Sequence, residues 1–487
     1  MRFLLTALFW IYYSVSSASA SETLDGPSFV PCSLTDANNT NILYAECSIW
    51  NQPLDHQKPS GKTIELFVTK IPSTAVAPSK HALTLINGGP GGSSVDLLVS
   101  FAPILQQVSQ HMDIIVLDQR GTGRSTALDC ENMSADVDPD TIDLALETKK
   151  CLDSLAFSPV SFTTSVAVRD LENLRIAMGY EQWNIYGTSY GTRVALHYLR
   201  RYEASVRSLT LDGVLPPSIS MGSNIAAMSD SALRTLFQNC SLDTDCKNAY
   251  PNLSDDFGAL SVYLKENNIE LRLRQPITNE LTTRSVSYPD LALIIRLSLY
   301  SPEMSALLPL TIHSAINENN YTSIAVSAQA FEEALQDAMS YGMHNAVMCT
   351  EDVPFHHPEQ TSSGQGKETY LGDEFWSSMQ SICSIWPAGK IDNDFKRPVL
   401  SSIPTLILSG ENDPITPPAY GDLLLDGLSN AVHLVGPQQG HGVMHRGCFT
   451  KIFSDFLTTA NVSSLESSCI GHLPRLPFFV DSLGPAP

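Results

Sequence analysis

The chain has 487 residues, with 29 basic and 51 acidic side chains and a formal net charge of −22 at pH 7. Hydrophobic residues make up 43% of it, which excludes a largely disordered protein and allows a large core with more than one substructure. An acidic surface repels nucleic acid and anionic membranes unless basic residues are concentrated somewhere. The sequence has no basic run, so no nucleic-acid partner is expected.

The first twenty residues have the pattern of a secretory signal peptide. Arg2 gives a minimal positive start, Phe3 to Tyr13 is apolar, and Ala18-Ser19-Ala20 supplies the small residues of a cleavage site. A membrane anchor is the alternative, but the apolar stretch is short for a bilayer and no later segment is long enough. We expect cleavage near Ala20, no membrane anchor, and a secreted or periplasmic protein.

Ten cysteines agree with export, because an even number in an oxidising compartment favours disulfides. No C-x-x-C spacing occurs and no histidine spacing suggests a metal site, so no metal and no cofactor is expected. Connectivity does not follow from sequence. Pairing each cysteine with its nearest neighbour gives Cys32–Cys47, Cys130–Cys151, Cys240–Cys246, Cys349–Cys383 and Cys448–Cys469.

Strands and helices alternate along the first part of the chain. Apolar stretches predict strands at 64–71, 82–86, 113–117, 183–186 and 208–211, and helical spacing predicts helices at 166–178 and 190–202. This alternation predicts a mostly parallel sheet with helices on both faces.

Two glycine-rich segments directly follow early strands. Residues 87–92 are Asn-Gly-Gly-Pro-Gly-Gly, a place suited to donating backbone N–H groups to an oxyanion, although a plain Gly-Pro turn is the alternative. Residues 118–125 are Asp-Gln-Arg-Gly-Thr-Gly-Arg-Ser. They contain neither the P-loop lysine pattern nor G-x-G-x-x-G, so nucleotide binding is not expected.

The pentapeptide at 187–191, Gly-Thr-Ser-Tyr-Gly, has the G-x-S-x-G form of a nucleophile elbow. It lies between a predicted strand and a predicted helix, as such an elbow requires. The two glycines are needed because any side chain there would strike the neighbouring strand or helix. The pattern indicates Ser189 as the nucleophile.

The pattern changes after residue 213. Residues 214–398 are mainly helical and irregular, and alternation resumes with strands at 405–408 and 431–435. The simplest organisation is a signal peptide at 1–20 and an α/β core at 21–213 and 399–487, interrupted by a large helical insertion at 214–398. We call the insertion the cap, because it would lie over the carboxyl ends of the strands, where ligands bind in open α/β sheets.

A serine nucleophile needs a base, because its hydroxyl is a poor nucleophile near neutral pH. In α/β-hydrolases the triad order along the chain is Ser, then Asp or Glu, then His. Asp413 follows a predicted strand closely, with Glu411 as its competitor. His441, between two glycines after the last predicted strand, is the base candidate, with His445 as its competitor.

The chemistry expected of these residues is acyl transfer. His441 would remove the Ser189 proton, and Asp413 would hold the imidazole tautomer and stabilise the imidazolium. The backbone N–H groups of Gly89 and Tyr190 would bind the oxyanion, and water would resolve the acyl-enzyme.

Together these segments resemble the proline iminopeptidases and secreted tripeptidyl aminopeptidases, whose fold is the α/β-hydrolase fold. Residues 87–92 look like their H-G-G-P-G-G loop, and 118–125 are similar to their D-Q-R-G-x-G-x-S segment. The elbow, acid and base motifs match in order, and the resemblance runs in patches from about Trp50 to Cys469. Asn87 stands where the family usually has His. Because the expected oxyanion donor is a backbone N–H group, this change of side chain leaves it intact.

The resemblance implies a serine exopeptidase that acts on peptides with a free N-terminus and releases one residue, such as proline, or a tripeptide. Such enzymes need carboxylates for the substrate's α-ammonium group. The Cys-Thr-Glu-Asp segment at 349–352 resembles the one used there, so Glu351 and Asp352 are the expected amine ligands. Two solvated acids beside a disulfide are the alternative.

Two other functions remain open at this stage. An ester or lipid hydrolase could use the same fold and triad, since these do not fix the acyl group. A non-catalytic binding protein on a hydrolase fold would be expected to have lost a triad member, and none is lost here.

Overall fold

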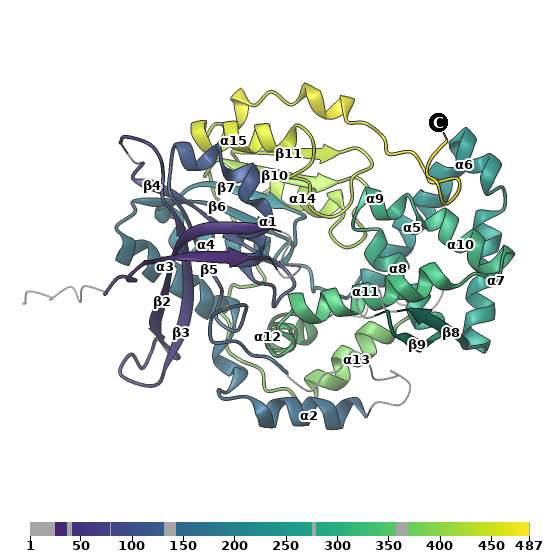
Figure 1. The fold of residues 1–487 in the computed structure, drawn as a ribbon. Helices are drawn as coiled ribbons and strands as arrows, with labels where there is room; N and C mark the ends of the chain where they lie inside the picture. The colour runs from purple at the N-terminus through teal and green to yellow at the C-terminus, as the bar shows by residue number, and fades with distance from the viewer. Residues whose placement is uncertain are drawn as a thin grey trace, which may run out of the picture.

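The computed structural model describes residues 25–36, 41–77, 79–130, 143–274, 279–356 and 369–486 (Figure 1). The expected signal peptide lies outside these residues. Within them, no helix is both apolar and long enough to cross a bilayer.

A nine-stranded sheet forms the core, in the order β1-β2-β3-β5-β4-β6-β7-β10-β11. The pairs along β5-β4-β6-β7-β10-β11 are all parallel. Strands β1, β2 and β3 pair antiparallel with one another, and β3 pairs antiparallel with β5. The strands are β1 (Val30–Thr35), β2 (Ile42–Pro53), β3 (Thr63–Ile71), β4 (His81–Ile86), β5 (Ile114–Leu117), β6 (Gln182–Thr188), β7 (Val206–Asp212), β10 (Thr405–Gly410) and β11 (Ala431–Gly436).

Helices cover both faces of this sheet, each over its own apolar layer. Side chains of α3 and α4 belong to one buried cluster, and those of α1 and α15 belong to another. The mostly parallel sheet covered on both faces is therefore confirmed. These helices are α1 (Ser94–Leu105), α3 (Thr164–Met178), α4 (Tyr190–Tyr202), α14 (Pro418–Leu425) and α15 (Phe449–Thr459). A further helix of the core segment, α2 (Leu144–Ser154), lies away from the sheet and packs against the cap (Figure 1).

The cap leaves the sheet after β7 and returns at β10 (Figure 1). It has a hydrophobic core of its own. It is mainly helical but also contains a two-stranded hairpin, β8 (Ile269–Arg274) with β9 (Leu281–Val286). Its helices are α5 (Ile225–Leu242), α6 (Thr244–Ala249), α7 (Leu253–Glu266), α8 (Tyr288–Ser298), α9 (Pro302–Ser305), α10 (Leu308–Asn317), α11 (Thr322–Ala338), α12 (Tyr341–Val347) and α13 (Glu374–Cys383).

The C-terminal tail differs from its expected place in the core. Figure 1 shows it running from α15 to the cap near α6. Phe479 donates its N–H to the Ala306 carbonyl at 3.1 Å and accepts from the Tyr250 hydroxyl at 2.9 Å, both in the cap. The tail therefore joins the two parts of the molecule.

Five disulfides are formed, and all five nearest-neighbour pairings are confirmed. One joins the antiparallel edge strands β1 and β2, which the sequence analysis did not predict. These bonds are consistent with a protein that works outside the cytoplasm.

Candidate active site

Ser189 occupies a strained turn between β6 and α4. Its backbone has φ 55° and ψ −128°, a conformation that costs free energy in any residue other than glycine. A Cβ at Gly191 would lie 2.2 Å from the Ile86 carbonyl oxygen in β4, and one at Gly187 would lie 2.6 Å from the Gly191 carbonyl oxygen. The strand–turn–helix elbow is therefore present, and both glycines are required by contact.

Asp413 and His441 form a buried pair beside this turn. Asp413 Oδ2 lies 2.8 Å from His441 Nδ1, and Asp413 is 4% exposed. The Asp413 carboxylate also accepts from the N–H groups of Ile415 and Thr416 and from the Thr416 hydroxyl. These bonds fix the carboxylate, and the carboxylate orients the ring so that Nε2 is free for the nucleophile.

Neither competitor takes part in this pair. Glu411 is solvent-exposed and accepts from the backbone N–H of Gln438. His445 packs against the ring of Phe101 with centroids 5.7 Å apart, and burial lowers its pKa to about 4. The structure thus brings together Asp413 and His441, which were the preferred candidates.

Asp212 was missed by the sequence analysis, although it ends a buried strand just as Asp413 follows one. Its fully buried carboxylate accepts from the N–H groups of Val443 and Met444 at 2.9 Å and from the Tyr186 hydroxyl at 2.9 Å. These bonds tie the loop that contains His441 to the carboxyl end of β7. We assign Asp212 as a positioning residue.

The charge around His441 favours its protonated form. Burial lowers the pKa of His441, but the charge and hydrogen bond of Asp413, with a contribution from Asp212, outweigh burial and raise it above 6.5. A base of this kind is poised to accept a proton near neutral pH.

The glycine loop lies directly against the nucleophile. A Cβ at Gly88 would be 2.6 Å from Ser189 Cβ, so only glycine allows this approach. The Asn87 side chain accepts from the Gly88 N–H and donates to the Ser93 carbonyl, which closes the loop without the usual His. Among the described residues the N–H groups of Gly89 and Tyr190 have no protein acceptor. Their assignment to the oxyanion stays a prediction that this arrangement allows.

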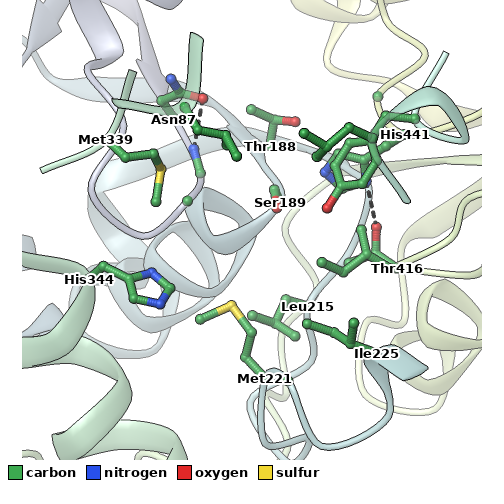
Figure 2. Close-up of a pocket in the computed structure, with 18 of the residues that line it drawn as sticks. Asn87, Thr188, Ser189, Leu215, Met221, Ile225, Met339, His344, Thr416 and His441 are labelled. Atoms are coloured by element: carbon green, nitrogen blue, oxygen red, sulfur yellow. Dashed lines mark hydrogen bonds between the residues drawn. The ribbon is translucent and has the colours of Figure 1, made fainter. Parts of the chain in front are cut away.

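Ser189 and His441 line one cavity of about 510 Å³ between the core and the cap. Figure 2 shows Ser189 between the Asn87 loop and His441, with Met221, Ile225 and His344 on the cap side. Apolar and aromatic side chains dominate the lining, and none of the Asp and Glu residues in the described chain contributes to it.

Glu351 and Asp352, the expected amine ligands, do not line this cavity. Both are fully buried and engaged by protein groups. Glu351 accepts from the N–H and the hydroxyl of Thr164 at 2.7 and 2.8 Å. Asp352 pairs with Arg193 at 2.7 Å and with Lys396 at 3.1 Å. Both carboxylates therefore lie where the cap meets α3 and α4, outside the lining of the cavity.

Comparison with known proteins agrees with this geometry. Residues 82–235 match the model of the alpha/beta hydrolase fold, and residues 368–469 match that of TAP-like protein. The chain has the α/β-hydrolase fold. The second match covers the part of this hydrolase that contributes Asp413 and His441.

Three relatives are similar over different shares of this hydrolase. Serine protease Hip1 of Mycobacterium tuberculosis is 22% identical over 467 residues, 87% of each chain, and carboxylesterase B of the same organism is 25% identical over 411 residues, 78% of each. Tripeptidyl aminopeptidase of Streptomyces coelicolor is 28% identical over 192 residues, 36% of each. These relatives support a serine peptidase or hydrolase. Two of them are named as enzymes that cleave peptide bonds and one as an enzyme that cleaves carboxylic esters.

A second Ser-His-Asp set shows why contact alone does not define the site. His433 lies 2.9 Å from Ser409 Oγ and 2.8 Å from Asp422 Oδ1, as in a triad. Ser409, however, is completely buried within β10. No substrate can reach it, so in this hydrolase the set serves to hold β10, β11 and α14 together.

Asp413→Asn tests the assigned acid. We expect kcat to fall by about 10⁴-fold, because the amide no longer holds the productive tautomer. His441 must be neutral to accept a proton, and its pKa is raised, so kcat/KM of the wild type should fall on acidification with a midpoint above pH 6.5. In the variant the pKa of His441 is no longer raised by Asp413, so this midpoint should move to lower pH. Asp422→Asn is the matched control and should keep wild-type rates. Equal losses in both variants would contradict the assignment.

Asp352→Asn tests whether that carboxylate is framework or ligand. Leaving the buried Arg193 guanidinium without its partner should lower the free energy of unfolding by about 3–5 kcal/mol. Denaturant unfolding measures this, with the exposed Glu270→Gln as a cap control. An unchanged stability with a raised KM for free-amine peptides would instead restore the role of amine ligand.

Proposed function

We propose that this protein is an exported serine exopeptidase that cleaves short peptides through an acyl-enzyme. The observation behind the proposal is the placement of Ser189 on a strained elbow, in one cavity with a His441 that Asp413 orients. The five disulfides support export.

Each group has a role in this mechanism. His441 takes the proton of Ser189, which attacks the scissile carbonyl, and Asp413 stabilises the imidazolium that forms. The N–H groups of Gly89 and Tyr190 bind the oxyanion of the tetrahedral intermediate. His441 then protonates the leaving amine, and water enters to release the acyl group.

The cap is the feature that supports short peptides as substrates. It covers the carboxyl ends of the strands and leaves a cavity of about 510 Å³, within the range of about 300–1,000 Å³ for small-molecule sites. A segment of a few residues suits that volume. The serine protease and tripeptidyl aminopeptidase among the relatives support a peptide bond as the target. Release from free N-termini is what the resemblance of the early loops implies.

A carboxylic-ester hydrolase is the second candidate. The cavity is lined mainly by apolar groups, and the described residues place no carboxylate in it for a substrate's ammonium group. The similarity to carboxylesterase B points the same way.

A panel of chromogenic substrates decides between these two. It contains p-nitroanilides of one to three residues, with free and with blocked N-termini, together with p-nitrophenyl esters of short acids. We expect peptide anilides to be cleaved with the higher kcat/KM, and Ser189→Ala to abolish the activity. Cleavage of esters alone would overturn the peptidase in favour of the esterase. A folded protein whose Ser189 fails to react with a fluorophosphonate would overturn both.

A further inference from the structure

Arg296 is the feature of the cavity that the proposed mechanism does not use. It lies in the last turn of α8 and lines the same cavity as Ser189 and His441. It makes no ion pair with any carboxylate of the described residues, and its Nε is buried without a hydrogen-bond partner. A cation is therefore held at an apolar site without a counter-ion.

Its position is close to the catalytic groups. Tyr300, two residues beyond the end of α8, packs its ring against His441 with centroids 5.1 Å apart, and its carbonyl accepts the backbone N–H of His441 at 2.9 Å. Burial raises the pKa of Tyr300, and the charge of Arg296, together with a hydrogen bond from its side chain, opposes that rise. The guanidinium also lies over the ring of Phe375, with the carbon 5.6 Å from the centroid, which fixes it against one wall.

The other ionisable groups of the lining do not cancel this charge. Burial lowers the pKa of His344 and of His445 to about 4, so both are neutral near pH 7. His441 is balanced by Asp413, to which it is hydrogen-bonded. The buried cap acids Glu351 and Asp352 are committed to Thr164 and to the pair of Arg193 and Lys396. One uncompensated positive charge remains.

We propose that Arg296 binds a carboxylate carried by the substrate, so that this hydrolase prefers anionic short peptides. A guanidinium presents paired donors that match a carboxylate, and the pair strengthens where water is excluded. The inference rests on the proposed function for its substrate. A free ammonium group beside Arg296 is disfavoured, whereas a carboxylate supplies the missing counter-ion.

The carboxylate has two sources in a short peptide, an acidic group on the acyl side or the C-terminus on the leaving side. Binding to Ser189→Ala, measured by calorimetry, separates them without requiring turnover. The acyl-side probes are trialanine amides whose N-terminus is succinylated, acetylated or free, with charges of −1, 0 and +1 at that end. The leaving-side probes are tetra-alanine as the acid and as the amide.

We expect a carboxylate-bearing probe of one of these sets to bind about 10- to 100-fold more tightly than its neutral partner. Adding Arg296→Gln should remove the preference, and Arg296→Glu should reverse it in favour of the cationic or amide probe. Arg272→Glu, at an exposed position of the cap hairpin, controls for a general change in charge and should keep the wild-type order. Loss of the preference in the succinyl series locates the carboxylate on the acyl side, and loss in the acid series locates it on the leaving side.

A structural role for Arg296 has a different signature. A cation in the last turn of a helix stabilises that end, and stacking on Phe375 adds to it, so Arg296→Gln would lower the melting temperature without changing the order of the probes. That result, or equal binding of charged and neutral probes by Ser189→Ala, overturns the inference. Hydrolysis of the same probes by the wild-type protein is measured separately. If the carboxylate probes bind more tightly but no probe is hydrolysed, the proposed peptidase function is refuted while the anion-binding role of Arg296 stands.

Discussion

The contact between Gly191 and the Ile86 carbonyl determines where the nucleophile lies. Because α4 approaches β4 at a distance that excludes any Cβ, the chain must turn sharply at Ser189 and accept a positive φ there. That turn points the Ser189 side chain out of the sheet and places the first N–H of α4 beside it. A residue larger than glycine at this point would move the helix, and with it both the nucleophile and one expected oxyanion donor.

The same helix also holds the cap. Arg193, one turn after Ser189, pairs with Asp352 of the cap, and Asp352 further accepts from the backbone N–H of Met221 at 2.8 Å. Thr164 joins Glu351 of the cap to the hydroxyl of Tyr190, 2.6 Å away. The walls of the cavity are thus fixed to the helix that carries the nucleophile, so substrate and reacting group share one frame. Removing one partner of such a buried pair is strongly destabilising, because the other charge is then left buried without compensation.

The sequence predicted the features that depend on neighbouring residues, and it did not predict those that depend on residues far away in the chain. Ser189, Asp413 and His441 come soon after apolar strands, and the carboxyl ends of parallel strands meet at one edge, so short segments were sufficient to locate them. The alternation of strands and helices similarly gave the sheet. Glu351 and Asp352 were attributed to the cavity from a local resemblance, but their environment is made by Thr164, Arg193 and Lys396, far away in the chain. Arg296 had no local signal at all, because a single arginine in a helix is ordinary until its neighbours are known.

The net charge of the chain does not decide what its cavity attracts. A charge of −22 is spread over an acidic surface, and salt screens such charges over about 8 Å at physiological ionic strength. Inside the cavity screening is weaker, so one guanidinium without a counter-ion dominates the local potential. The surface then repels an anionic peptide at long range while the site holds it at short range. The two effects separate in experiment, because added salt weakens the surface repulsion and speeds association of an anionic peptide, whereas the buried pair with Arg296 is screened much less.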